Sequence, residues 1–135
     1  MALFNWNNTY SVGVQEIDKQ HKVLVDLINE LHDGMKLGKG KETLGEVLNE
    51  LVRYTVYHFG YEEKIMETAK YSEVNLHKRA HKDLVEQVQK IKNDYEGGRT
   101  VLTMEVMTFL KDWLGNHIMG TDKKYSSHLN SKGIS

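Results

Sequence analysis

Cysteine and proline are both absent from this chain of 135 residues. Without cysteine there are no disulfide bonds, and no thiolate can serve as a metal ligand. Without proline the sequence lacks the commonest cause of a broken α-helix. Every part of the chain is therefore free to form long helices, and any metal site must be built from nitrogen and oxygen ligands.

The sequence also lacks an excess of charge and a long apolar run. Its formal net charge is -1, with 27% charged residues, and the acidic and basic side chains are interspersed. This pattern argues against a nucleic-acid surface or a polybasic membrane patch. No apolar stretch approaches the ~20 residues that span a bilayer, and residues 1–6 do not form a signal peptide. We expect one domain over residues 1–135, monomeric and cytoplasmic, with no nucleic-acid or membrane partner.

Apolar residues recur at alternating steps of three and four along four stretches, which is typical of helices with one buried face. The stretches run over about 17–36, 41–66, 74–95 and 101–120, separated by turns at 36–41 and 96–99 and a connection at 68–72. Asp18 is the expected N-cap of the first helix. The second stripe contains Leu44, Leu48, Leu51, Thr55, His58, Glu62 and Ile65.

Helices of this length joined by short turns predict an all-α fold, an antiparallel up-down-up-down four-helix bundle with an N-terminal extended arm. We expect the arm over residues 1–16, the bundle over 17–120 and a C-terminal segment over 121–135. The arm would be held by Phe4, Trp6, Val12 and Val14. The C-terminal segment is polar, and we expect it to be partly frayed.

Five of the seven histidines lie on the inward stripes, and all five fall at one end of the predicted bundle. In an antiparallel bundle, the N-terminal ends of the first and third helices lie beside the C-terminal ends of the second and fourth helices. Glu62 follows His58 by four residues, an offset of only ~40° around a helix. The residues that this topology brings together are His21, His58, Glu62, His77, His81, His117 and Asp122.

Imidazole and carboxylate groups without thiolates suit iron, zinc, copper or manganese. Seven ligands are more than one ion can use, so we expect two ions. Suppose that both carboxylates and one solvent-derived oxygen bridge two six-coordinate ions, so that each ion has three positions left. Five histidines then fill three positions on one ion and two on the other ion. One position then stays open for a small molecule.

His117 and Asp122 are five residues apart, or ~140° around a regular helix. They can share a face only if the helix is broken or bulged, and we expect the break at Gly120 and Thr121. The competing interpretation of the inward histidines is a structural bundle with satisfied core side chains. His32 and His128 lie outside the predicted cluster, and Glu63 lies off the stripe, where alanine should be tolerated.

The motifs together resemble the hemerythrin family, and most closely its single-domain bacterial members. They are Ile17-Asp18-Lys19-Gln20-His21, His58 with Glu62 and Glu63, His77 with His81, and Trp113-Leu114-Gly115-Asn116-His117-Ile118 followed by Asp122. The resemblance implies two iron ions joined by an oxo or hydroxo bridge. It also implies reversible binding of O2 for storage, transport or delivery, with O2 held as hydroperoxide on the iron that has the open position.

By this resemblance His77, His81 and His117 hold the saturated iron, His21 and His58 hold the other, and Glu62 and Asp122 bridge. The residues matching the family's apolar O2 pocket are Leu24, Phe59, Trp113, Leu114 and Ile118. A further protein that receives the O2 would be the partner.

Two other functions compete with oxygen storage or transport. A di-iron oxidase or peroxidase would also use a four-helix bundle, but such oxidases carry Glu-x-x-His pairs and more carboxylates than histidines. This sequence has no Glu-x-x-His, so binding is favoured over catalysis and we do not expect an enzyme. A module that senses O2, nitric oxide or redox state is the second alternative, and it would need a partner or a longer parent chain.

Overall fold

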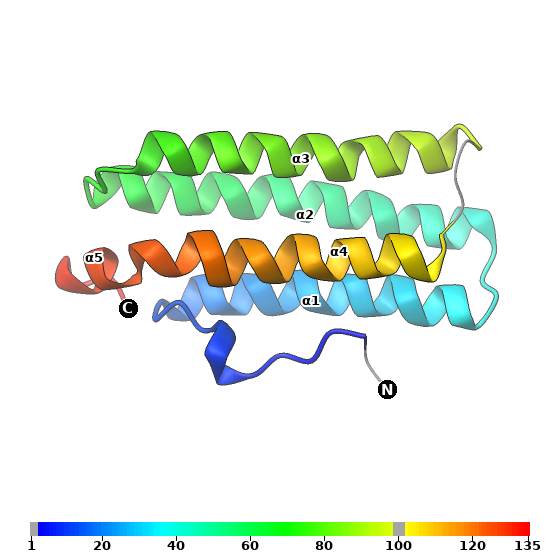
Figure 1. Ribbon diagram of the computed structural model, residues 1–135, viewed down its shortest axis with the longest axis horizontal. Coiled ribbons are helices and arrows are strands. Elements are labelled where there is room, and N and C mark those ends of the chain that lie inside the picture. The colour runs from blue at the N-terminus through cyan, green and yellow to red at the C-terminus, as the bar shows by residue number, and fades with distance from the viewer. Residues whose placement is uncertain (1–2, 99–101) are drawn as a thin grey trace.

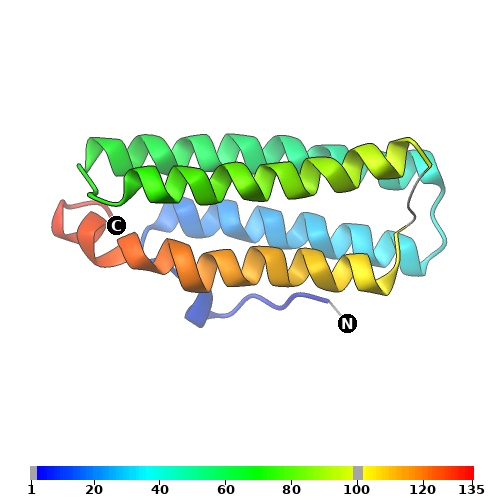
Figure 2. The same cartoon turned by 45° about the horizontal axis from the view of Figure 1, so that its top comes forward.

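Four long helices form an antiparallel bundle in the computed structural model, which describes residues 3–98 and 102–135. They are α1 (Gln15–Lys36), α2 (Lys41–Thr68), α3 (Val74–Glu96) and α4 (Met104–Asn116). Successive helices run in opposite directions, and the two views agree on this arrangement (Figures 1 and 2). The predicted all-α, up-down-up-down architecture is confirmed, and the described residues contain no strand.

The inward stripes form the core as predicted. On α1 and α2 the stripes are buried from Ile17 to Leu31 and from Leu44 to Glu62. On α3, His77, His81, Val88 and Tyr95 are buried, and the neighbouring apolar residues pack partly exposed against them. The buried polar residues gather at one end of this apolar core.

The N-terminal arm lies along the bundle and contains one short 3₁₀ turn, η1 (Asn8–Tyr10). Phe4, Val12 and Val14 are buried and Trp6 is partly buried, as predicted. The side chain of Asn29 on α1 accepts a hydrogen bond from the Phe4 backbone N–H and donates one to its carbonyl, both at 2.8 Å.

The predicted N-cap at Asp18 is wrong, because α1 begins at Gln15 and Val14 precedes it. The carboxylate of Asp18 instead accepts hydrogen bonds from the Ser11 hydroxyl at 2.6 Å and from the Val12 N–H at 2.8 Å. A short polar side chain that could cap the helix therefore fixes the arm to it. The expected boundary of the bundle at residue 17 is two residues late.

The C-terminal segment is ordered, which corrects the expectation of a frayed tail. After α4 the chain continues through a π-helical turn, η2 (His117–Thr121), a 3₁₀ turn, η3 (Asp122–Tyr125), and a last helix, α5 (Ser126–Ser131). Tyr125 and Leu129 are fully buried. Asn130 donates a hydrogen bond to the Gly13 carbonyl at 3.0 Å, and Ser126 donates one to the Val12 carbonyl. The C-terminal segment thus packs against the end of the arm at residues 12 and 13.

The start of α4 also differs from the prediction. The helix begins at Met104, after the Thr103 side chain, which accepts a hydrogen bond from the Val106 N–H at 3.2 Å. The expected start at residue 101 and the Arg99 end of the preceding turn lie outside the described residues. Among the residues that the structure describes, no helix is long and apolar enough to cross a membrane.

Candidate metal centre

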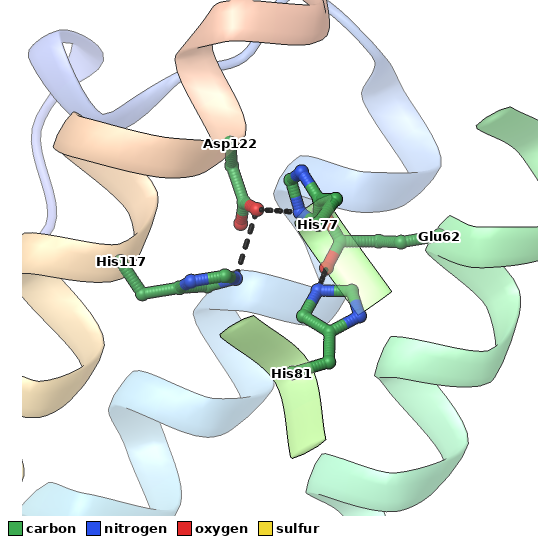
Figure 3. A group of neighbouring side chains, drawn as sticks. All are labelled: Glu62, His77, His81, His117 and Asp122. Carbon is green, nitrogen blue, oxygen red and sulfur yellow. Dashed lines mark hydrogen bonds and ion pairs between the residues drawn. The ribbon is translucent and has the colours of Figure 1, made fainter. Parts of the chain in front are cut away.

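The seven residues predicted to converge do lie together at one end of the bundle. Their nitrogen and oxygen atoms form two groups, in each of which all the candidate atoms lie within 4.8 Å of one another. The first group has three histidines and the second has two, and both contain Glu62 and Asp122. The members of the first group are Glu62, His77, His81, His117 and Asp122, drawn in Figure 3. The second group adds His21 and His58 to the same two carboxylates.

Asp122 lies between the two groups. Its Oδ1 is 2.8 Å from His77 Nε2 and 2.9 Å from His117 Nε2 (Figure 3). Its Oδ2 is 2.9 Å from His21 Nε2. One carboxylate oxygen thus faces the three-histidine group and the other faces the two-histidine group.

Glu62 also contacts both groups. Its Oε1 lies 2.9 Å from His58 Nε2 in the two-histidine group and 3.4 Å from His81 Nε2 in the three-histidine group. Its other oxygen, Oε2, accepts a hydrogen bond from the Tyr125 hydroxyl. The carboxylate is therefore held from behind by a neutral donor while its free oxygen points to the histidines.

The π-helical turn η2 brings Asp122 onto the face of His117. The backbone N–H of Asp122 donates to the His117 carbonyl, five residues back, in the hydrogen-bond pattern of a π-helix. Residues five apart then lie one above the other, which a regular α-helix forbids. The sequence correctly indicated a bulge between these two candidate ligands, but a widened turn produces it and the helix is not interrupted at Gly120.

Two of the candidate ligand histidines are hydrogen-bonded by side chains from neighbouring helices. The Nδ1 atom of His58 is 2.7 Å from Gln20 Oε1, and that of His81 is 2.8 Å from Glu63 Oε2. Both oxygens are acceptors, so each ring carries its proton on Nδ1 and turns a bare Nε2 lone pair toward the cluster. Glu63 lies off the apolar stripe, but it contacts His81 across the α2–α3 interface, so alanine there would remove a contact to the cluster.

Sequence reasoning did not identify Gln20, Glu63 or Tyr125 as part of the site. Tyr125 follows Asp122 by three residues, so helical spacing could have suggested it. Gln20 and Glu63 are each adjacent to a predicted ligand in sequence, but their contacts are to histidines on other helices. No spacing along one helix could show such contacts.

Burial and charge act in opposite directions on the two carboxylates. For Glu62, burial and the nearby charge of Asp122 favour the neutral acid, but His58 and His81 outweigh them and lower the pKa. For Asp122, burial also opposes ionisation, but His117, His21 and His77 hold the pKa well below its usual range. Both carboxylates therefore stay ionised and available as ligands.

The pKa values of two neighbouring groups shift upward. Burial lowers the pKa of His117, but the Asp122 carboxylate outweighs it, so the net shift is upward. Burial raises the pKa of Tyr125 well above its usual range, and the charges of Glu62 and Asp122 add to the effect. Tyr125 thus remains a protonated donor to Glu62, and the cluster as a whole attracts positive charge.

The cluster leaves buried polar atoms without partners, and a metal ion would satisfy them. Among the described residues, the inward Nε2 atoms of His21, His58, His81 and His117 make no hydrogen bond, nor do Glu62 Oε1 and Asp122 Oδ2. Unpaired buried polar groups are costly, and bare lone pairs about 3 Å apart repel unless a cation lies between them. The donor set of imidazole and carboxylate fits iron.

All five predicted pocket residues are buried. Each lies within four residues of a candidate ligand in the sequence, on one of the helical elements that carry the cluster. Phe59 contacts the histidines directly. Its ring stacks on His81 with centroids 3.9 Å apart, and its centroid lies 5.4 Å from that of His117 and 5.7 Å from that of His58. Trp113 donates a hydrogen bond to the Leu84 carbonyl at 3.2 Å and lines a surface hollow with His117. Leu24, Leu114 and Ile118 belong to the apolar core.

The two remaining histidines lie outside the cluster, as expected. His32 is buried on α1, with Nδ1 3.8 Å from the Asp33 carboxylate. His128 on α5 has Nε2 2.7 Å from the Ala69 carbonyl. His128 thus has a local hydrogen-bond partner, whereas the buried Nδ1 of His32 makes no hydrogen bond among the described residues.

Comparison with known proteins gives a consistent result. The model of the Hemerythrin HHE cation binding domain matches residues 12–129. A bacteriohemerythrin of Stenotrophomonas maltophilia (strain R551-3) is 35% identical over 134 residues, covering 96% of this chain and 86% of its own. One of Pseudomonas aeruginosa (strain LESB58) is 38% identical over 125 residues, covering 93% and 80%. A crystal structure of wild-type hemerythrin superposes with a TM-score of 0.89 at 32% identity, covering 95% of this chain and 98% of that one.

Proposed function

This chain belongs to the hemerythrin family of iron-binding proteins, and we propose that it binds O2 reversibly at two iron ions. The observation that supports this most strongly is the division of seven buried ligands into two groups that share Glu62 and Asp122. Three histidines on one side and two on the other provide for two ions, one of them with a free position. When bound, the iron pair supplies the electrons that hold O2 and recovers them on its release.

The chain's own residues set the conditions for reversibility. Glu62 and Asp122 offset the charge of the metal pair in a core that has little other means of solvating it. Gln20 and Glu63 hold the His58 and His81 rings with their lone pairs inward. Tyr125 holds Glu62 by its hydroxyl. A site fixed in this way needs no rearrangement to bind or release a ligand.

The apolar residues around the cluster exclude water. Leu24, Leu114 and Ile118 are at most 2% exposed. His21 and His58, the histidines of the two-histidine group, are fully buried. A dry pocket favours release of the bound gas as O2 and not as reduced products, because protons and water are kept away. We therefore assign Leu24, Phe59, Trp113, Leu114 and Ile118 to the O2 pocket.

The ligand set favours binding over catalysis. Histidines outnumber carboxylates five to two, and this gives the ions less anionic charge than an oxidase uses to reach high-valent iron. The proposed protein is thus an O2 carrier or store and not an enzyme. The monomeric state, the cytoplasmic location and a protein that receives the O2 stay predictions.

Reversibility is tested directly with ferrous protein. The chain is loaded without oxygen, its iron content is measured, and air is then admitted and removed with inert gas. We expect two irons per chain and a visible absorption band that appears with air and disappears without it. One iron per chain would contradict the two-ion site, and a band that stays after the air is removed would indicate oxidation.

The bridging role of Glu62 is tested by Glu62→Ala. We expect weak iron retention and no reversible spectrum, because the variant loses a ligand shared by both groups. The matched control is Glu67→Ala, an acid on the exposed side of α2 that pairs with Lys78. Glu63→Ala is not a suitable control, since Glu63 contacts His81. Equal iron content in the Glu62 and Glu67 variants would refute the assignment.

A further inference from the structure

Each group of candidate ligands contains one histidine whose outer nitrogen is hydrogen-bonded, and the two partners differ in charge. His58, in the two-histidine group, donates to the neutral amide of Gln20 at 2.7 Å. His81, in the three-histidine group, donates to the carboxylate of Glu63 at 2.8 Å. The amide orientation is supported by a second contact, since Gln20 Nε2 donates to Glu16 Oε2 at 3.3 Å.

The two partners also differ in their surroundings. Gln20 is 1% exposed, whereas the Glu63 side chain is 27% exposed. Glu63 lies at a surface hollow of about 420 Å³ between α2 and α3, whose lining includes His81 and Glu86. The Glu63 carboxylate is thus partly solvated, while the His81 ring that it contacts is 2% exposed. Its charge acts on the cluster through His81.

A carboxylate partner makes an imidazole a stronger ligand than an amide partner does. The N–H···O⁻ bond is charge-assisted, and it increases the electron density that the opposite nitrogen offers to a metal. Such a ligand stabilises a ferric ion more than a ferrous one. The three-histidine group has this arrangement at His81, and the contact at His58 lacks the charge.

We propose that Glu63 is a positioning residue that orients His81 and, by its negative charge, lowers the reduction potential of the iron in the three-histidine group. This inference rests on the proposed function, because it requires iron at His81. The ion without a free position is then the easier of the two to oxidise. Glu63 would thereby set how readily the whole centre passes to the diferric form.

The test compares three substitutions at Glu63 with one matched control. Glu63→Gln keeps a hydrogen-bond acceptor and removes the charge, Glu63→Asp keeps the charge, and Glu63→Ala removes both. Glu86→Gln removes the same charge from the α3 side of the same hollow. For each variant, iron per chain, helix content and the midpoint potential of the iron centre are measured in an anaerobic redox titration.

We expect Glu63→Gln to hold two irons with a more positive midpoint potential, and Glu63→Asp to stay near the parent. Glu63→Ala should shift in the same direction and lose about 10- to 100-fold in iron affinity. Glu86→Gln should shift the potential much less than Glu63→Gln. Equal potentials in the parent and Glu63→Gln, or equal shifts in Glu63→Gln and Glu86→Gln, would overturn the inference.

Two further outcomes are decisive. Iron loss from Glu63→Ala with unchanged helix content, while Glu63→Gln, Glu63→Asp and Glu86→Gln keep both ions, would support the positioning role. Iron loss together with helix content would overturn it, because Glu63 would then act on the fold. Failure of the proposed function is seen separately, in a parent protein that does not hold two irons or does not bind O2 reversibly.

Discussion

At the scale of single residues, the contact between Tyr125 and Glu62 shows how a polar core is made stable. Glu62 is fully buried, and an ionised carboxylate there needs compensation on both oxygens. Histidines face Oε1, and the Tyr125 hydroxyl donates to Oε2. Because the pKa of Tyr125 is raised by burial and by the nearby carboxylates, the donor keeps its proton.

Tyr125→Phe removes this donor and little else. A hydrogen bond to a charged group contributes about 1.5–3 kcal/mol, so we expect lower stability and faster loss of iron to a chelator. Tyr71→Phe is the control, since its ring also packs against Tyr125 but its hydroxyl donates to Glu73 and not to Glu62. Equal rates of iron loss from both variants would show that the Tyr125 hydroxyl does not hold Glu62 in place.

Leu114→Ala tests the dry pocket. Leu114 is 2% exposed and precedes His117 by three residues, so the two share a helix face. We expect a loss of ~2–5 kcal/mol in unfolding free energy. We also expect faster autoxidation, measured as decay of the oxygenated spectrum at equal iron content.

Leu110→Ala is the matched control, because Leu110 is equally buried one turn earlier on α4. Its stability should fall by a similar amount, while autoxidation stays near the parent rate. If the Leu114 variant also decays at the parent rate, the pocket is closed by another residue, and Trp113 or Ile118 would be examined next.

At the scale of elements, the end of α4 is decided by a change in helix type. Thirteen residues of α-helix are followed by the π-helical turn and then a 3₁₀ turn that begins at Asp122. Backbone geometry thus aligns two candidate ligands, His117 and Asp122, that are five residues apart. Gly120 lies within the π-helical turn, but it does not have a positive φ, and a Cβ there would meet open space.

Gly120→Ala should therefore preserve the centre. Glycine in a helix costs roughly 0.5–1 kcal/mol relative to alanine, so the variant should unfold at the same or a higher temperature with two irons retained. Gly13→Ala provides the contrast, since Gly13 has φ +73° and a Cβ there would lie 3.1 Å from Asn130 Oδ1. Iron loss from Gly120→Ala would mean that the turn needs glycine after all.

At the scale of the whole molecule, the bundle concentrates polar groups at one end and apolar groups over the rest. The N-terminal arm and α5 cover the polar end, and they join through Ser126, Asn130 and the backbone of residues 12–13. The buried cluster has unpaired nitrogen and oxygen atoms. The stability of the fold should thus depend on whether metal ions occupy the cluster.

Removal of iron should lower the unfolding temperature. A ligand that binds only the folded state stabilises it by about 2.7 kcal/mol at a free concentration 100 times Kd, for each site. Thermal unfolding of ferrous protein, with and without a chelator and under anaerobic conditions, measures the difference. In Asp122→Ala, the chelator should change the unfolding temperature very little, because both groups lose a ligand. An equally small change in the parent would contradict the buried metal pair.

The sequence by itself determined the bundle and most of the convergence of the candidate ligands. The stripe from Leu44 to Glu62, like those on the other helices, repeats with the period of an α-helix. Short turns between the helices make the bundle antiparallel, and this fixes which helix ends lie together. Residues like His21, His58 and His117 are therefore brought to one layer by regular geometry alone. The clustering of the five histidines with Glu62 was predictable for this reason, whereas Asp122 joins them through the π-helical turn.

Only the tertiary structure decided the contacts between side chains on different elements, which the helical period of the sequence does not describe. Gln20 to His58, Glu63 to His81 and Tyr125 to Glu62 each join different helices or turns, and they depend on the rotation and separation of neighbouring elements. The same holds for Asp18, whose carboxylate binds the arm and does not cap α1. Periodicity reports which face of a helix is buried, whereas the partner that a polar side chain finds depends on packing between elements.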